Sequence, residues 1–187
     1  MRQQDVERQV RRAQQGDARA FERLYDAFYD RVYGFVRSRV PDVETAKDLA
    51  ATVFIRAWEA LPSYDIRGVP FAAWLFRIAR NAVIDEYRRM AREVERVSED
   101  DAAMVADAGA VDEAVIARCD AETVRRAVRR LTDEQAAVIA LRFFWDMPVT
   151  DVAKALGKTE GAVKAMQHRA VRMLARILSE EADGRPE

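Results

Sequence analysis

Residues 70–92 have the sequence P-F-A-A-W-L-F-R-I-A-R-N-A-V-I-D-E-Y-R-R-M-A-R, which has the periodicity of an amphipathic helix. Its apolar side chains recur at helical spacing and form one stripe, made of Phe71, Trp74, Leu75, Ile78 and Ala82. Polar side chains fall largely off that stripe, namely Arg77, Arg80, Asn81, Arg88 and Arg89. The stretch therefore predicts a helix with one buried side and one cationic side.

The loop before this helix, residues 63–69, brings polar and aromatic groups to the start of the helix, among them Tyr64 and Arg67. Pro70 follows, where its fixed φ and missing N–H cost little. An unstacked base is held by stacking and edge hydrogen bonds, and its backbone is held by Lys and Arg, so loop and helix together suit a nucleic-acid site. Arginine on the wet side of a helix is also ordinary, so the helix alone leaves a merely solvated face open.

Composition favours two small helical domains. The chain has 187 residues, of which 50% are hydrophobic and 34% are charged, as in soluble proteins. Gly and Pro are sparse and alternating β-branched runs are missing, so we expect an all-α protein. No apolar run approaches the roughly 18 residues of a membrane span, and the first residues lack the apolar core of a signal peptide. We therefore expect a cytoplasmic protein without membrane insertion.

Charge is segregated along the chain although the net charge is −1. Residues 1–92 carry a net +4, residues 93–120 a net −7 and residues 121–178 a net +5. Two basic blocks flanking an acidic one suggest two modules that meet a polyanion and a segment that does not. Chance clustering of surface charge would give a similar pattern. We predict an N-terminal domain over residues 1–92, an acidic linker over 93–111 and a C-terminal domain over 112–187.

Helix punctuation divides the N-terminal domain. We expect helices over residues 5–15, 18–40 and from residue 43 to just before Pro62, with Asp17 and Asp42 as N-caps. The side chains predicted to face the core from the second helix are Phe21, Leu24, Tyr25, Phe28, Val32 and Phe35, and those from the third are Ala46, Leu49, Ala50, Val53, Phe54 and Trp58.

The C-terminal domain opens with a predicted helix over residues 112–130, followed by a capping-box pattern from Thr132 to Gln135. The helix after this box is expected to turn Ala136, Ile139, Ala140 and Phe143 inward. Cys119 is the chain's one cysteine, which excludes an internal disulfide and a multi-cysteine metal site.

Residues 149–178 have the pattern of a helix-turn-helix, with a short helix ending near Leu156, a turn at Gly157 and a long helix capped by Thr159. In such a motif the second helix enters the major groove by its N-terminal part. Candidates for base edges are Glu160, Lys164, Gln167 and His168, and candidates for phosphates are Lys158, Arg169 and Arg172. The two helices are expected to pack through Val152, Leu156, Val163, Ala170 and Leu174. A basic helical hairpin without a DNA role would have the same spacing.

Four segments in order resemble one family, the sigma factors of bacterial RNA polymerase in their extracytoplasmic-function (ECF) group. They are G-D-A-R-A-F-E-R-L-Y from Gly16, D-L-A-A-T-V-F-I-R-A-W from Asp48, P-F-A-A-W-L-F-R-I-A-R-N-A-V-I-D-E-Y-R-R from Pro70 and L-G-K-T-E-G-A-V-K-A-M-Q-H-R-A from Leu156. A general helix-turn-helix regulator would share only the last of them. The resemblance implies a protein without catalytic activity or cofactor that gives core RNA polymerase its promoter specificity.

The resemblance also implies roles for residues. Contact with the clamp helices of the largest polymerase subunit falls on Asp48, Leu49, Phe54 and Arg56, and the flap of the second largest subunit is a further partner. Recognition and opening of the −10 element fall on Tyr64, Arg67, Phe71, Arg77, Arg80, Asn81, Arg88 and Arg89, with Asn81 at an extruded base. Recognition of the −35 element falls on Lys158, Thr159, Glu160, Lys164, Ala165, Gln167, His168, Arg169 and Arg172. An anti-sigma protein is a further expected partner.

The sequence departs from the family pattern in two places. Ala51 and Thr52 stand where the family often has an amide and a carboxylate, so polymerase contact would depend more on Asp48, Arg56 and apolar packing. Met166 and Gln167 replace a common Arg and aliphatic pair, and either of the two could face the core.

Two other classes of protein were weighed against this one. A stand-alone transcriptional regulator would bind DNA tightly without polymerase. An enzyme acting on nucleic acid has little support, because the chain has one histidine, no metal-ligand spacing and no Gly-rich phosphate loop. The adjacent acids Asp85 and Glu86 are expected instead to form salt bridges with Arg88 or Arg89.

Overall fold

The computed structural model describes residues 1–95 and 121–183, and within these ranges every regular element is helical. The all-α prediction is thereby confirmed. The elements are α1 (Gln3–Gln14), α2 (Ala18–Arg39), α3 (Val43–Ala60), a short 3-10 turn η1 (Leu61–Ser63), α4 (Phe71–Glu95), α5 (Ala121–Arg129), α6 (Asp133–Ile139), a π-helical turn η3 (Ala140–Phe144), α7 (Val149–Leu156) and α8 (Glu160–Asp183). The acidic linker was predicted over residues 93–111, but residues 93–95 belong to α4. The rest of the predicted linker, the helix start at 112–120 and Cys119 lie outside the described residues.

The N-caps that the sequence predicted are present at the starts of α2, α3 and α6. The side chain of Asp17 accepts a hydrogen bond from the backbone N–H of Ala20, and that of Asp42 accepts one from Thr45. Thr132 and Gln135 form the reciprocal capping box at the start of α6. Each cap satisfies a backbone donor that the first helical turn leaves without a partner.

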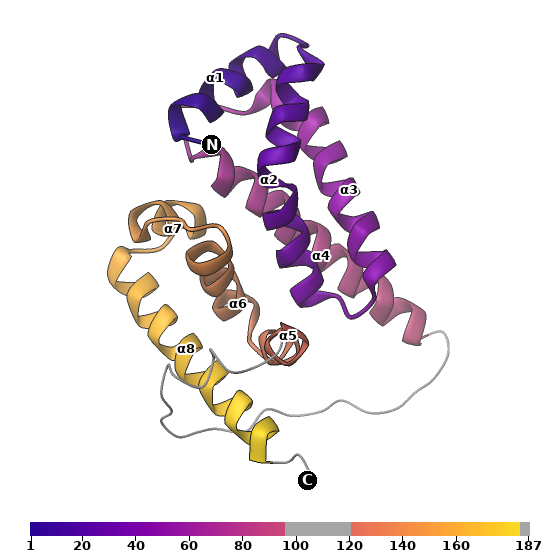
Figure 1. The fold of residues 1–187 in the computed structure, drawn as a ribbon, viewed down its shortest axis with the longest axis vertical. Helices are drawn as coiled ribbons and strands as arrows, with labels where there is room; N and C mark the ends of the chain where they lie inside the picture. Colours follow the sequence, from indigo (N-terminus) through magenta and orange to yellow (C-terminus); the bar gives the residue numbers. More distant parts are fainter. Residues whose placement is uncertain (96–120, 184–187) are drawn as a thin grey trace.

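Helices α1 to α4 pack around one apolar core, in which the predicted stripes of α2 and α3 take part (Figure 1). Two side chains predicted to face this core lie partly at the surface instead. Tyr25 is 36% exposed and Trp58 is 39% exposed. They remain in contact with the core through their ring edges, since Tyr25 lies 4.6 Å from Phe54 and Trp58 lies 4.9 Å from Phe21 between ring centroids.

The prediction for Phe143 was wrong, because this side chain is 59% exposed. Helix α6 continues into the π turn, where the backbone N–H of Trp145 donates to the carbonyl of Ala140, five residues earlier, at 3.0 Å. A π turn adds one residue to the helical register and so rotates the side chains that follow. As a result Trp145, 1% exposed, takes the inward position.

The two domains pack against each other (Figure 1), which the sequence did not predict. The larger apolar cluster is continuous from α1–α4 into α6, η3 and α7, while a second cluster lies among α5, α6 and α8. Trp145 lies at the centre of the domain contact, with its ring centroid 5.7 Å from that of Phe76 on α4 and 6.1 Å from that of Phe28 on α2. The position of α4 in the fold is therefore set by both domains.

Candidate nucleic-acid interface

The polar side of α4 carries the arginines that the sequence singled out. Arg77, Asn81, Arg88 and Arg89 are exposed and Arg80 is half-buried. The expected salt bridges are confirmed, since Arg88 lies 3.9 Å from Asp85 and Arg89 lies 2.6 Å from Glu86. The hydrogen bond from Arg89 lowers the pKa of the Glu86 carboxyl, which stays ionised although its residue is buried.

The loop before α4 is held in shape by its own hydrogen bonds. The hydroxyl of Tyr64 donates to the carbonyl of Val69 at 2.7 Å, and the side chain of Asp65 accepts from the backbone N–H of Arg67 at 2.9 Å. Burial raises the pKa of Tyr64 to about 12, so its hydroxyl remains a donor at neutral pH. Gln14 of α1 donates to the carbonyls of Leu61 and Tyr64, which fixes the loop to α1.

This loop borders a pocket of about 280 Å³ between α1, the loop and α7. Its lining includes the exposed Arg67, with Gln3 and Glu7 from α1 and Asp151 and Lys154 from α7. The sequence predicted a nucleic-acid site at this loop and the helix that follows it. It did not predict that the C-terminal domain would supply one wall.

Three aromatic residues expected at binding surfaces are buried instead, namely Phe54, Tyr64 and Phe71. Their rings pack in the core, where Tyr64 and Phe71 are 5.9 Å apart between centroids. The prediction that these side chains contact a partner directly is therefore wrong for this arrangement. Instead they pack beneath the surface and hold the helix and loop in place. Trp74 also packs on this cluster, 4.8 Å from Tyr64, which agrees with the core role that its place in the stripe predicted.

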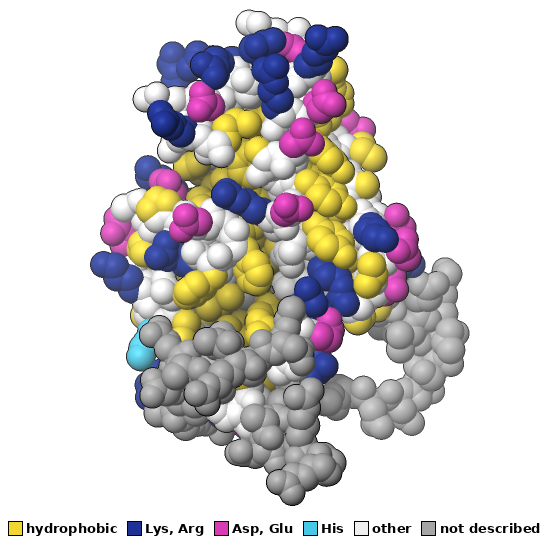
Figure 2. Space-filling view, in the orientation of Figure 1, with side chains coloured by type: hydrophobic (Ala, Val, Ile, Leu, Met, Phe, Trp, Pro, Cys, Tyr) yellow, Lys and Arg dark blue, Asp and Glu magenta, His cyan; other side chains and the backbone are white. Residues whose placement is uncertain are grey.

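The surface of α3 carries a second group of site residues. Asp48 and Arg56 are exposed, Leu49 is half-buried, and Arg56 pairs with Asp85 of α4 at 3.0 Å. Around them lie apolar side chains that the sequence reasoning missed as surface residues, and Figure 2 shows hydrophobic side chains along this side of the molecule. Ile55 is 59% exposed. The signal was an isoleucine directly after the inward-facing Phe54, because adjacent helical positions face different ways.

The helix-turn-helix has the predicted geometry. Helix α7 ends at Gly157, whose φ of 64° is left-handed, and the hydroxyl of Thr159 accepts from the N–H of Ala162 at 3.2 Å. Val152, Val163, Ala170 and Leu174 are buried and Leu156 is half-buried. The expected contact between the two helices is confirmed for Val152, Leu156 and Val163, which share one apolar cluster, whereas Ala170 and Leu174 pack with α5 and α6 instead.

The N-terminal half of α8 presents its polar side chains to solvent. The exposed residues are Lys158, Thr159, Glu160, Lys164, Ala165, His168, Arg169 and Arg172. Met166 is 6% exposed, so it is Met166 that faces the core, whereas Gln167 is half-exposed and accepts a hydrogen bond from Arg142 at 3.2 Å. Lys158 pairs with Glu134 at 2.7 Å, and this contact lowers the pKa of the Glu134 carboxyl.

Other kinds of site were sought over the same residues. Across the described parts of the chain, no three His, Cys, Asp or Glu side chains gather as they would around a metal ion. The described helices include none that is long and apolar enough to cross a bilayer.

These features define a two-module, all-helical protein of the DNA-binding class, with a helix-turn-helix in its second module. Family models agree with both modules, because Sigma-70 region 2 matches residues 24–93 and Sigma-70 region 4 matches residues 121–174.

Among individual proteins, the ECF RNA polymerase sigma factor BldN of Streptomyces coelicolor is 38% identical over 186 residues, which are 92% of this chain and 66% of BldN. The ECF RNA polymerase sigma factor SigL of Mycobacterium tuberculosis is 32% identical over 157 residues, 84% of this chain and 88% of SigL. The chain belongs to the ECF RNA polymerase sigma factors.

Solved structures agree with the fold. The structure of CnrH in complex with the cytosolic domain of CnrY has a TM-score of 0.67 and 26% identity, and covers 94% of this chain and 98% of that chain. The sigma factor RpoE in complex with the anti-sigma factor NepR, from Bartonella quintana, has a TM-score of 0.64 and 23% identity and covers 85% of this chain and 96% of that chain.

Proposed function

We propose that this chain binds core RNA polymerase in the cytoplasm and directs it to promoters that share two spaced elements. The observation that carries the proposal is that two exposed polar surfaces, one in each domain, occur together in a chain that belongs to this family. One is the side of α4 with Arg77, Arg80 and Asn81, and the other is the N-terminal half of α8 with Lys164 and His168.

The N-terminal domain is assigned to the −10 element. Melting costs on the order of 1.4 kcal/mol per base-pair step in lost stacking, and a protein without ATP meets that cost only by binding the separated strand. Asn81 is assigned to an extruded base, and Arg77, Arg80, Arg88 and Arg89 to phosphates. The loop with Arg67, held by the buried Tyr64 and Phe71, borders a separate pocket that Asn81 does not line, and it is assigned to the same −10 element.

The C-terminal domain is assigned to the −35 element. Lys164, Ala165 and His168 project from one exposed side of α8 and are assigned to base edges, with Glu160 and Gln167 beside them. Lys158, Thr159, Arg169 and Arg172 are assigned to the flanking phosphates. The hydroxyl of Thr159 satisfies a backbone N–H at the N-terminus of α8, and a helix N-terminus favours negative charge.

Polymerase is assigned to the surface of α3. Asp48 and Arg56 supply charge, Leu49 supplies half-buried apolar area and Phe54 supports the surface from below. The exposed Ile55 and Trp58 add apolar area that suits a protein partner. Two weak DNA modules held on one polymerase gain affinity through effective concentration. An anti-sigma protein that covers these surfaces, and the polymerase flap beside the C-terminal domain, complete the proposed partners.

Run-off transcription with purified core polymerase and a promoter library tests this proposal. We expect wild-type protein to start transcription at promoters with two spaced elements, Asn81→Ala to change preference at the downstream element and Lys164→Ala at the upstream one. Arg8→Ala, on the exposed side of α1, is the matched control and should change neither. Tight duplex binding without any start-site specificity for core polymerase would instead identify a stand-alone regulator.

A further inference from the structure

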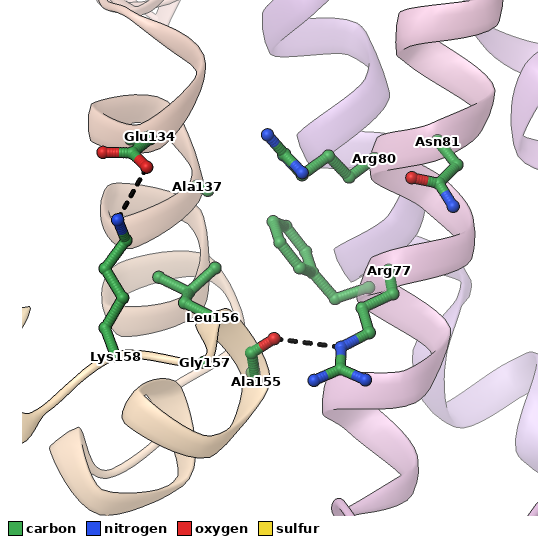
Figure 3. Close-up of a pocket in the computed structure, with 10 residues that line it drawn as sticks. Arg77, Arg80, Asn81, Glu134, Ala137, Ala155, Leu156, Gly157 and Lys158 are labelled. Atoms are coloured by element: carbon green, nitrogen blue, oxygen red, sulfur yellow. Dashed lines mark hydrogen bonds and ion pairs between the residues drawn. The ribbon is translucent and has the colours of Figure 1, made fainter.

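A pocket of about 340 Å³ lies between α4 and the C-terminal domain (Figure 3). Its polar lining comes from both sides, because Arg77, Arg80 and Asn81 belong to α4, whereas Glu134 and Lys158 belong to the C-terminal domain. Three of these side chains are cations and one is a carboxylate, so the lining has an excess of positive charge. Such a pocket favours an anion that carries more than one negative charge.

Arg80 has a donor in this pocket that lacks a partner. Its Nε is fully buried and makes no hydrogen bond with any residue that the structure describes. The side chain reaches from α4 toward the wall that carries Glu134 (Figure 3), and Arg80 adds to the larger effect of Lys158 in lowering the pKa of the Glu134 carboxyl. A buried donor of a charged group is costly when it is unpaired, and an acceptor within the pocket removes that cost.

The other polar side chains keep donors in reserve. Arg77 donates from Nε to the carbonyl of Ala155 at 2.9 Å and from Nη2 to the carbonyl of Lys154 at 3.1 Å (Figure 3), which fixes its guanidinium beside the pocket. Lys158 lies 2.7 Å from Glu134, and an ammonium group has three donors in all. An anion in the pocket therefore meets positioned donors from both domains.

The remaining lining is apolar or small and suits carbon groups, and it consists of Phe76, Ala137, Ala155, Leu156 and Gly157. The volume is at the lower end of the range for pockets that hold small molecules. A phosphate monoester carries a charge of about −1.5 to −2 at neutral pH and has three strong acceptor oxygens. Such a group matches both the charge of the pocket and the number of its cations.

We propose that this pocket binds the phosphate monoester of a small metabolite, with the phosphate among Arg77, Arg80 and Lys158 and the carbon part against the apolar lining. The site goes beyond the proposed transcription function and does not depend on it. One consequence does rest on that function. Because Arg77 and Arg80 are assigned there to phosphates of the −10 strand, the bound ester and the strand compete for the same side chains.

Isothermal titration of the full-length protein tests the site. The probes are ribose 5-phosphate and adenosine 5′-monophosphate, and the references are inorganic phosphate and adenosine. We expect both esters to bind, inorganic phosphate to bind more weakly because it lacks the carbon part, and adenosine not to bind because it lacks the phosphate. The tighter of the two esters shows whether the carbon part is a sugar or a nucleoside.

Four variants separate the pocket from general attraction of anions. Arg80→Gln and Lys158→Gln should each weaken ester binding by about tenfold or more, since each removes a charge-assisted hydrogen bond. Glu134→Gln should strengthen binding, because it removes the one carboxylate of the pocket, and damage to the fold would not produce that gain. Arg88→Gln is the matched control, an exposed arginine of the same helix that lies outside the pocket, and should leave ester affinity unchanged.

The site would be overturned if neither ester bound at about 1 mM, or if adenosine bound as tightly as its monophosphate. Equal weakening by Arg88→Gln and Arg80→Gln would show attraction to a basic surface and would also overturn it. Inorganic phosphate as tight as the esters would overturn the claim that the ligand is an ester. Failure of the proposed function has a different signature, namely ester binding as expected with no start-site specificity in transcription.

Discussion

The two surfaces proposed to bind DNA, on α4 and on α8, differ in their packing although both carry basic side chains. On α4, Arg77 is bonded to the carbonyls that end α7, and Arg80 is half-buried beside the C-terminal domain. On α8, Lys164, His168 and Arg169 are exposed. Arg77, Asn81, Arg88 and Arg89 of α4 are exposed as well, so the C-terminal domain engages two donors of Arg77 and lies beside Arg80 without covering the whole surface. Residue type alone identifies a binding surface, but packing decides when that surface can be used.

The difference has a simple origin in the cores. Helix α8 packs by its apolar side against α5 and α6, which leaves its N-terminal polar side outside. Helix α4 has the core of its own domain on one side and Trp145 with α7 beside it. Helix α8 therefore packs only within its own domain, whereas α4 packs against both domains.

Removing the central side chain of the domain contact should have the largest effect. Trp145→Ala should lower the free energy of unfolding by about 3–5 kcal/mol, because it leaves a cavity at a site that is 1% exposed. Urea unfolding measures this, with Trp58→Ala as the control for a tryptophan at the surface. Similar losses for the two variants would show that Trp145 does not hold the domains together.

The two surfaces should respond differently in the free protein. Lys164→Ala and His168→Ala should each weaken binding to a −35 duplex by about 1–3 kcal/mol, since each removes a contact to a base edge. Asn81→Ala should leave this affinity unchanged and act only in the polymerase complex. Fluorescence anisotropy without polymerase gives the comparison. An Asn81 effect as large as that of Lys164 would remove the distinction between the surfaces.

Salt dependence should separate phosphate contacts from base contacts on α8. Arg169→Ala and Arg172→Ala should each reduce the slope of log affinity against log salt by about 0.9, because each phosphate contact releases about one counterion. Titrations at several salt concentrations measure the slope, and Arg8→Ala on α1 is the control. Unchanged slopes would place these two arginines away from the backbone.

Acid should have the smallest of these effects, at the pair between Glu134 and Lys158. Lys158 lowers the pKa of Glu134 below its usual 4.5 in the folded protein. The stabilisation is therefore present above that usual value and is lost as the pH falls through the lowered one. The free energies of unfolding of wild type and Glu134→Gln, measured from about pH 7 to about pH 3, should become equal at the acid end. If the difference in unfolding free energy between wild type and Glu134→Gln stayed constant with pH, the ion pair between Glu134 and Lys158 would not be its cause.

Local signals in the sequence predicted much of the fold. Asp17, Asp42 and Thr132 cap helices as expected, and Gly157 makes the turn of the helix-turn-helix, because each acts within a few residues of itself. The salt bridge between Glu86 and Arg89 has the same local character.

Long-range packing escaped the sequence analysis. The π turn that exposes Phe143 and buries Trp145 has no marker in residue type, because it depends on what Trp145 meets on the other domain. Nothing in the sequence distinguishes Arg39 from other helix arginines, because its burial depends on contacts with α5 and α6. The site residues were chosen by chemistry and resemblance, and so Tyr64 and Phe71 were selected although they are buried.

A reversible cross-link tests the central claim, that the proposed transcription function requires the contact between the two domains to open. Gln3 and Lys154 are exposed and line, from opposite domains, the pocket that the loop with Arg67 borders, so the single-cysteine controls carrying the same reagent report any blocking of that pocket itself. Gln3→Cys/Lys154→Cys, in a Cys119→Ser background, is joined by a bismaleimide that contains a reducible disulfide, with each single-cysteine variant as control. We predict that the joined protein fails to start transcription with core polymerase and that reduction restores it. Full activity of the joined protein would contradict the account.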